Sequence, residues 1–248
     1  MLSLISFWGT MDDMTTTSAP RTARERARAE LTSEIKEVAR RQLADQGSAA
    51  LSLRAVAREL GMVSSAVYRY FPSRDELLTA LIIDAYDSVG DAATGAEAAV
   101  ARSDLLGRWM ATCRAVRAWA VANPQEYALI FGSPIPGYEA PQDTIDPAAR
   151  IPTLLLAVVS ESVAAGRPVT DPGVALPRAV RRDLKPVRQT AAPALDDVGL
   201  ARAITAWTLL IGAISFELFG HLHNVIHDYE AHFDFEMRAL AHSLGLDP

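Results

Sequence analysis

Cysteine is nearly absent from this chain of 248 residues, which carries a single one at Cys113. One thiol excludes an intramolecular disulfide and any zinc site that needs several cysteines. Hydrophobic residues make up 50% and charged residues 22% of the chain, so a wholly disordered protein is excluded as well. The scarcity of cysteine fits the reducing cytoplasm, where we expect the protein to be located.

A secretory signal is also lacking at the amino terminus. The apolar stretch MLSLISFWGT has no positive charge before it, and MDDM follows it in place of a small-residue cleavage site. Met11 and Met14 offer alternative translation starts. We therefore expect residues 1–20 to be a disordered extension, or the product of a misplaced start, outside the fold.

Common catalytic motifs are missing too. The sequence contains no G-x-S-x-G, no P-loop, no H-E-x-x-H and no G-x-G-x-x-G. We accordingly expect no enzymatic activity and no cofactor.

Strand patterns and internal repeats are almost absent, whereas apolar residues recur three and four positions apart over long stretches. This spacing predicts an all-α fold. The expected helices cover about 22–45, 53–60, 64–70, 73–91, 104–123, 124–132, 147–165, 199–222 and 229–244. Residues 166–198 contain five prolines and are expected to form a long flexible loop.

Positive charge is scarce overall, because the net charge is −6. Residues 21–75 nevertheless hold 11 Lys and Arg against 7 Asp and Glu, so this segment carries +4 and the remainder −10. Phosphate binding requires positive charge only on the surface that contacts nucleic acid. The distribution predicts a small basic domain, residues 21–75, attached to a larger acidic domain, residues 76–248.

The segment 52–78, SLRAVARELGMVSSAVYRYFPSRDELL, predicts a helix-turn-helix. Gly61 joins two short helices, because glycine permits the backbone angles of a tight turn. The inner face of this three-helix unit is expected to consist of Leu53, Val56, Ala57, Leu60, Met62, Val67 and Phe71. The hydroxyl and guanidinium groups left outside are groups that contact phosphates and bases. On these residues alone, an ordinary helical hairpin with surface tyrosines stays open as an alternative.

Residues 31–91 resemble the DNA-binding domain of the TetR/AcrR family of regulators. The shared pattern is Ile35-x3-Ala39-x3-Leu43-x3-Gly47, Ser52-Leu53-x2-Val56-Ala57-x2-Leu60-Gly61 and Val67-Tyr68-x-Tyr70-Phe71-x-Ser73-Arg74-x2-Leu77-Leu78. One position, Val63, departs from the family, which usually has a capping serine or threonine there, so Ser64 is the alternative cap of this helix.

The resemblance implies that residues 64–70 form the recognition helix. It assigns backbone phosphates to Tyr68 and Tyr70, and the major groove to Ser64, Ser65, Ala66 and Arg69. It assigns further phosphates to Ser52, Arg54 and Arg74. The basic run Arg21, Arg24, Arg26 and Arg28 is expected to reach the backbone or an adjacent minor groove.

From residue 203 to 220 the only charged side chain is Glu217, which predicts a helix buried on more than one side. A membrane span is an alternative of near-minimal length, but Glu217, several hydroxyls and two glycines argue against it, and we expect no membrane attachment. We expect instead a homodimer, formed by a four-helix bundle of the last two helices of each chain, on a palindromic double-stranded operator. The stretches Trp207-x4-Gly212 and Phe216-Glu217-Leu218-x-Gly220-His221 resemble a TetR subgroup with a WHG-type C-terminal domain, although Ile211 stands where its histidine is expected.

A pocket for a small-molecule effector is expected among the helices of residues 104–220, and its apolar lining favours a hydrophobic effector. Packing in the core is the alternative role for every candidate. The candidates are Trp109, Cys113, Trp119, Tyr127, Phe131, Tyr138, Leu155, Trp207 and Phe216.

The sequence therefore predicts a TetR-type one-component transcriptional regulator. We expect a repressor that the effector releases from DNA by moving the helix after Ser73. Two alternatives remain: an all-helical small-molecule-binding protein or enzyme with a vestigial DNA-binding domain, and a metal sensor. The metal sensor would use His221, His223, His227 and His232. The basic stretch 178–188 could form a second nucleic-acid patch instead of a solvated loop.

Overall fold

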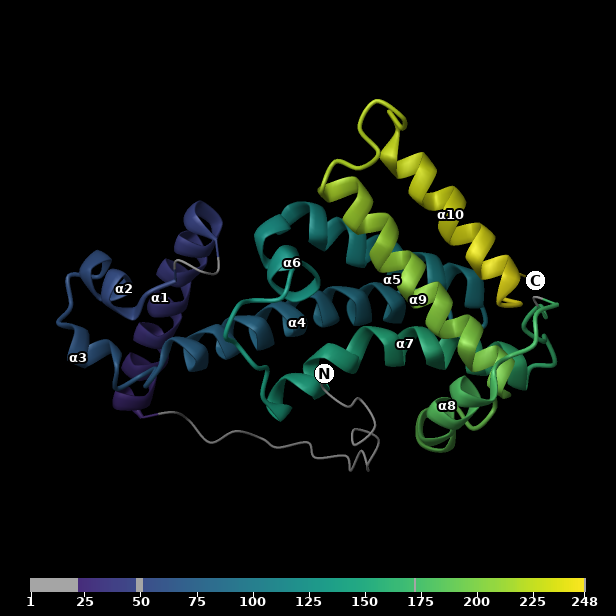
Figure 1. Cartoon of the computed structure of the whole chain (residues 1–248), viewed down its shortest axis with the longest axis horizontal. Coiled ribbons are helices and arrows are strands. Elements are labelled where there is room, and N and C mark those ends of the chain that lie inside the picture. The colour runs from purple at the N-terminus through teal and green to yellow at the C-terminus, as the bar shows by residue number, and fades with distance from the viewer. Residues whose placement is uncertain (1–21, 48–50, 172, 248) are drawn as a thin grey trace. The chain divides into compact units, whose positions relative to one another are not determined.

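Every regular element in the described part of the chain is a helix, which confirms the predicted all-α class (Figure 1). The computed structural model describes residues 22–47, 51–171 and 173–247. The predicted extension at residues 1–20 and the side chain of Arg21 lie outside these ranges. The helices are α1 (Ala23–Gln46), α2 (Leu53–Glu59), α3 (Ser64–Val67), α4 (Arg74–Ala98), α5 (Leu105–Ala122), α6 (Pro124–Phe131), a short 3₁₀ turn (Gln142–Thr144), α7 (Ile145–Ala164), α8 (Arg178–Ala191), α9 (Asp197–Leu218) and α10 (Tyr229–Ser243).

The described residues form two compact units. The amino-terminal unit comprises 22–85 together with 125–144, and the carboxy-terminal unit comprises 86–124 together with 145–247. Helix α4 runs from the first unit into the second. The contacts within the structure divide the two units after Ala85. The domain boundary after residue 75 stays a prediction from the sequence.

Helix α1 begins with a capping box that the sequence alone did not reveal. The Thr22 hydroxyl accepts a hydrogen bond from the Glu25 N–H at 3.2 Å, and the Glu25 carboxylate accepts one from the Thr22 N–H at 2.7 Å. These bonds satisfy amide groups that a helix start leaves free. Further along α1, one face is buried against the helix-turn-helix through Ile35, Val38, Ala39 and Leu43.

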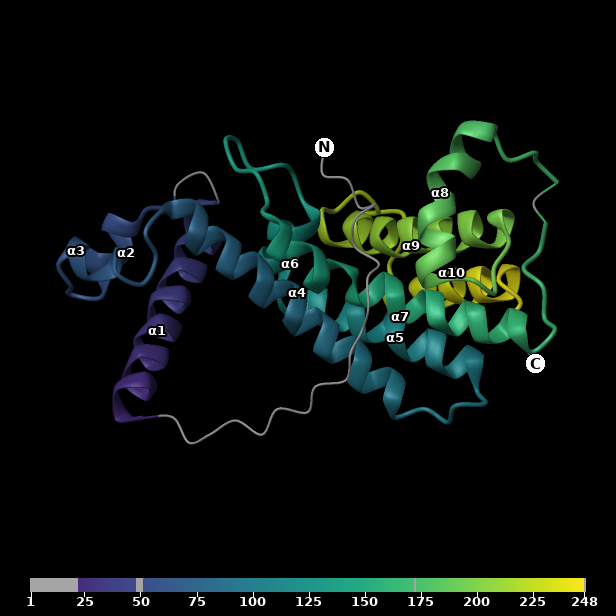
Figure 2. The same ribbon diagram turned by 90° about the horizontal axis from the view of Figure 1, so that it is seen from below.

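The carboxy-terminal unit is built around α5, which contacts α7, α9 and α10. Figures 1 and 2 show α9 and α10 side by side, joined by the turn at 219–228. The buried Trp109 of α5 fixes α10, because its indole N–H donates to the Met237 carbonyl at 3.0 Å. A buried indole N–H normally has such a partner, since leaving it unpaired costs free energy.

An ion-pair cluster centred on the buried Arg108 and Glu97 joins three helices of this unit. Arg108 of α5 is 1% exposed, and its guanidinium donates to Glu97 of α4 at 2.5 Å and to Glu161 of α7 at 2.6 Å. Arg102 contacts the same two carboxylates at 2.6 and 2.7 Å. A buried charge is tolerated only when it is paired in this way, so the cluster holds the end of α4 against α5 and α7.

Helix α8 corrects the expectation of one long loop over 166–198. Within that segment Arg178–Ala191 is helical, with Pro177 at the N-cap and Pro186 inside the helix. Helix formation separates two kinds of side chain: Leu184 is buried, whereas Arg181 and Lys185 are exposed. The count of prolines obscured this amphipathic pattern, which is the physical reason that the helix forms.

Two helical segments have the length and composition of membrane spans. Residues 142–164 and α9 reach mean hydropathies of 1.2 and 1.5. The same composition serves a core helix, and α7 and α9 pack against each other and against α5. Helix α9 is nevertheless exposed along one face, where Leu209 and Phe216 are 47% and 52% exposed.

Candidate nucleic-acid interface

The turn between α2 and α3 forms as predicted. Gly61 has a φ of 66°, in the left-handed region that favours glycine. The following N–H, of Met62, donates to the Ala57 carbonyl at 2.8 Å and closes the turn. Ala57 and Val56 are fully buried beneath it, so α2 and α3 are held at a fixed angle.

Helix α3 is shorter than the predicted 64–70. It ends at Val67, and residues 68–70 continue as tight turns in which the Tyr70 N–H donates to the Val67 carbonyl at 2.9 Å. Pro72 has no N–H to donate and stops any continuation. The recognition segment therefore consists of one helical turn followed by a tightened end.

The buried Val67 sets which side chains of this segment face outward. Because each residue of a helix turns by about 100°, Ser65 lies on the side opposite Val67, and it is exposed together with Tyr68 and Arg69. The other predicted contact residues of the segment are half-buried: Ser64, Ala66 and Tyr70. The structure thus presents two hydroxyl groups and a guanidinium on the outer side of the motif.

The three predicted phosphate ligands outside α3 lie near the starts of α2 and α4. Ser52 is the N-cap of α2, and its side chain makes no capping hydrogen bond. Arg54 is exposed, and among the described residues it forms no ion pair, as is also true of Arg69. Arg74 contacts Asp75 at 3.3 Å. Unpaired arginines at this surface are suited to phosphate or guanine.

A contact that the sequence analysis missed links α1 to the recognition segment. The Arg28 guanidinium lies 5.1 Å from the centre of the Tyr70 ring and donates to the Arg69 carbonyl at 3.5 Å. Cation–π contacts of this kind hold an aromatic ring in place. Arg28 and Arg69 are 41 positions apart in the sequence, so no local pattern could have indicated the contact.

Ion pairs at the base of the same unit fix α1 against α4 and α6. Asp84 accepts from Lys36 and Arg40, both at 2.8 Å, and Arg40 also lies 3.0 Å from Glu126. A further pair connects α1 to α2, where Arg41 donates to Glu59 and holds the pKa of that carboxyl below its usual range. These ion pairs therefore hold the helix-turn-helix against α1, and α1 against α4 and α6.

The nine predicted effector contacts do not lie in one unit. Tyr127, Phe131 and Tyr138 belong to the amino-terminal unit, where the Tyr138 hydroxyl lies 2.9 Å from the Thr79 hydroxyl. The rest belong to the carboxy-terminal unit: Trp109, Cys113, Trp119, Leu155, Trp207 and Phe216. Their role as effector contacts remains a prediction.

Four of the candidates in the carboxy-terminal unit are buried in its packing. They are Trp109, Cys113, Trp119 and Leu155. The Trp119 indole donates to the Ser88 hydroxyl at 2.9 Å. Burial raises the pKa of the Cys113 thiol, which therefore stays protonated.

The histidines at 221–232 do not assemble a metal site within the described residues, where no three His, Cys, Asp or Glu side chains converge. His232 instead lies 3.7 Å from Glu236, one turn further along α10. The alternative of a histidine-based metal sensor gains no support from this geometry.

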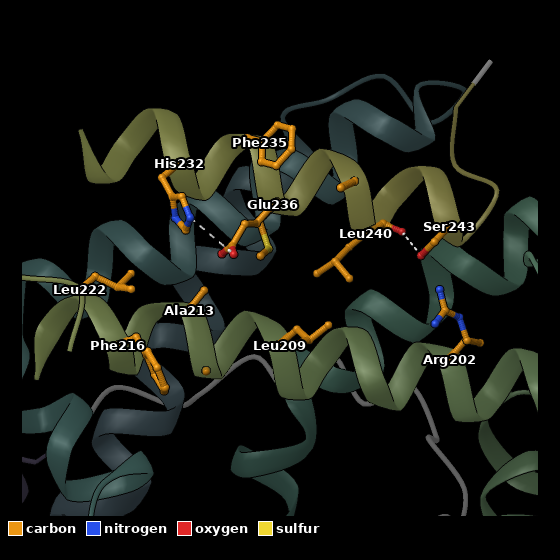
Figure 3. Close-up of a pocket in the computed structure, with 13 residues that line it drawn as sticks. Arg202, Leu209, Ala213, Phe216, Leu222, His232, Phe235, Glu236, Leu240 and Ser243 are labelled. Atoms are coloured by element: carbon orange, nitrogen blue, oxygen red, sulfur yellow. Dashed lines mark hydrogen bonds and ion pairs between the residues drawn. The ribbon is translucent and has the colours of Figure 1, made fainter. Parts of the chain in front are cut away.

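A groove of about 720 Å³ lies between α9 and α10 (Figure 3). Apolar side chains make most of its lining, among them Leu209, Phe216, Phe235 and Leu240. Figure 3 places Arg202 at one end of the groove and the His232–Glu236 pair at the other. Phe235 is 71% exposed, so this groove is an open apolar surface rather than an enclosed pocket.

Two family models match the chain. Residues 35–81 match the model described as "Bacterial regulatory proteins, tetR family", and residues 109–240 match "Tetracyclin repressor-like, C-terminal domain". The matched ranges contain the helix-turn-helix, the whole of α6, α7, α8 and α9, and most of α5 and α10.

Curated relatives are similar over most of the chain. The HTH-type transcriptional regulators Mb1846 of Mycobacterium bovis and Rv1816 of Mycobacterium tuberculosis are each 43% identical over 198 residues, which covers 79% of this chain and 84% of theirs. The crystal structure of the regulatory protein SCO4313 is 40% identical, with a TM-score of 0.71, over 90% of this chain and 98% of that one. A TetR-family transcription regulator from Shewanella sp. PV-4 is 22% identical, with a TM-score of 0.56, over 84% and 94%, and shows the shared fold alone.

Proposed function

The chain belongs to the TetR family of transcriptional regulators, and from this we propose that it is a homodimeric repressor that binds a palindromic operator and leaves it when a small hydrophobic effector binds. The observation that carries the proposal is the outer face of the recognition segment. There Ser65, Tyr68 and Arg69 are exposed together, and these groups contact phosphates and base edges.

The groove between α9 and α10 supports the homodimer. Leu209, Phe216 and Phe235 are about half or more exposed along this surface. Contiguous exposed apolar surface is unusual in a soluble monomer and marks an association site. In a twofold dimer the same patch faces itself, so the cationic and anionic ends of the groove, Arg202 and Glu236, are available to pair across the axis.

Two recognition segments held in one dimer account for a palindromic operator, because the symmetry of the DNA then matches that of the protein. Release by an effector requires a conformation that the effector binds better and that fits the operator poorly. Helix α4 runs from the amino-terminal unit into the carboxy-terminal unit. A ligand that shifts the carboxy-terminal unit therefore also shifts α4. The apolar character of the predicted contact residues favours a hydrophobic effector.

We assign the protein to the cytoplasm, without membrane attachment and without catalytic activity. The buried Cys113 thiol is unsuited to nucleophilic chemistry, because burial keeps it protonated. The apolar segments α7 and α9 are accounted for by packing within the unit and by the proposed dimer surface.

The test is a selection of genomic fragments by the purified protein, followed by measurement of Kd for the selected fragment. The wild type is expected to enrich a sequence with two inverted half-sites. The double variant Tyr68→Ala with Arg69→Ala is expected to lose at least tenfold in affinity, at about 1–3 kcal/mol for each specific contact removed. Arg114→Ala, which removes an arginine of α5 that is 50% exposed, serves as the control and retains wild-type affinity. Unchanged binding by the double variant would contradict the proposal.

A further inference from the structure

Val63 is an exposed aliphatic side chain at the start of the recognition helix. It is 71% exposed, and in the described part of the amino-terminal unit Tyr68 is the other large apolar side chain exposed by more than 36%. Its neighbours in the motif behave differently, since Val56 and Val67 are fully buried. Burial in the core therefore does not explain a valine at position 63.

Helix capping does not explain this valine either. Val63 is the N-cap of α3, with an extended backbone at φ −70° and ψ 139°, and no side chain caps the helix. Serine, threonine, aspartate and asparagine are the residues that stabilise this position, because their oxygen accepts a hydrogen bond from a free N–H. The local structure thus favours a polar residue where the chain has an apolar one.

The position of Val63 suits contact with a base. In a helix-turn-helix, the residues at the amino-terminal end of the recognition helix approach base edges in the major groove. Ser64 and Ser65, which follow directly, are small and leave room for such an approach. The one apolar group that the major groove offers is the C5-methyl group of thymine. A branched aliphatic side chain is complementary to this methyl group and to no hydrogen-bonding group of a base.

We propose that Val63 contacts the C5-methyl group of a thymine in each operator half-site and thereby selects an A·T pair at that position. This inference rests on the proposed operator binding and adds to it one residue with one base. Contact with the methyl group removes apolar surface of both partners from water, which is favourable without any directional bond.

The experiment removes the methyl group from the DNA. In the selected operator each thymine is replaced in turn by deoxyuridine, and Kd is measured by fluorescence anisotropy for the wild type and for Val63→Ala. For the wild type we expect an affinity loss of about fourfold at one position in each half-site, the value for one buried methyl-sized group. Val63→Ala is expected to bind the thymine and deoxyuridine forms of that position equally.

Two controls separate this contact from a general loss of folding or of binding. Val121→Ala, which shortens an exposed valine of the carboxy-terminal unit, is expected to keep the wild-type deoxyuridine profile. Val63→Ala itself is expected to keep the wild-type dependence on every other operator position.

Three results would overturn the inference while leaving operator binding intact. They are a half-site with no fixed thymine, a wild-type profile without a deoxyuridine penalty, and a penalty that Val63→Ala retains at every position. Failure to select any sequence would instead overturn the proposed function itself.

Discussion

Single residues beside the recognition segment show how stability and recognition compete. Val63 leaves the start of α3 without a side-chain cap. The Arg28 guanidinium makes a cation–π contact with the Tyr70 ring. Neither side chain is buried in the core of the unit. Both concern the surface that we propose contacts DNA.

A prediction at this scale concerns the missing cap. Val63→Ser is expected to stabilise the protein by about 0.5–1 kcal/mol, because the serine hydroxyl can accept from a free N–H of α3. The expected rise in Tm is about 1–4 °C for a chain of this size. Val121→Ser, near the end of α5, provides no cap and should not raise Tm. A lower Tm for Val63→Ser would show that the valine stabilises the fold after all.

The sequence located the residues of the recognition segment better than their conformation. The apolar spacing identified the buried Val56, Ala57 and Val67, because local periodicity reports which side of a helix is inward. It predicted a helix three residues longer than α3, because the tight turns after Val67 continue the same spacing of apolar residues. The Arg28–Tyr70 contact depends on tertiary structure and left no local signal.

Among the elements, α4, α5 and α7 are connected near their ends by a cluster of charged side chains. Arg108, Glu97 and Glu161 connect the three helices through hydrogen bonds of 2.5 and 2.6 Å. No local sequence pattern indicated this cluster, because its members lie 11 and 53 residues apart. Helix α8 shows the opposite limitation: its amphipathic pattern was present in the sequence, but its prolines favoured a loop.

We predict that Arg108→Ala destabilises the protein by about 1.5–3 kcal/mol, because the buried Glu97 would lose its buried partner and keep only the exposed Arg102. Thermal unfolding measures the effect, and the matched control is Arg114→Ala on the same helix. Arg114 pairs with Asp234 but is 50% exposed, so its loss should cost at most about 1 kcal/mol. Equal effects of the two substitutions would contradict a structural role for the cluster.

The same cluster predicts a dependence of stability on pH. The Arg108 guanidinium holds the pKa of the Glu161 carboxyl below its usual range through a hydrogen bond. A carboxyl with a lowered folded-state pKa contributes stability that is present above its ordinary pKa, about 4.3, and that is lost as the pH falls through the lowered value. The difference in Tm between the wild type and Arg108→Ala should therefore shrink below about pH 4. A difference that stays constant down to pH 3 would show that Glu161 contributes nothing.

For the whole molecule, the two-unit organisation explains which predictions could not be made from sequence. Residues 125–144 join the amino-terminal unit, although 39 residues lie between Ala85 and the start of this segment. Pairings such as Arg40–Glu126 and Thr79–Tyr138 produce this arrangement, and no periodicity encodes them. The effector candidates Tyr127, Phe131 and Tyr138 consequently belong to the amino-terminal unit and the other six to the carboxy-terminal unit, whereas the all-α class followed directly from the spacing of apolar residues.

At this scale we predict that Phe235→Asp converts the proposed dimer into monomers, because a carboxylate in the apolar groove would lose its hydration on association. Analytical ultracentrifugation measures the mass directly. Val174→Asp is the control, since Val174 is 73% exposed outside the groove. A dimer that persists in Phe235→Asp would place the contact between subunits elsewhere.

The most direct test of the central claim is a titration of the wild-type protein against the selected operator and against a scrambled duplex, over a series of salt concentrations. We expect the operator to be bound with a Kd of about 10⁻⁸–10⁻¹¹ M, at least a thousandfold more tightly than the scrambled duplex. We also expect the affinity for the operator to fall steeply as the salt concentration rises, because phosphate contacts release counterions. Equal affinity for the two duplexes, or no binding to either, would contradict the claim that this helix-turn-helix recognises an operator.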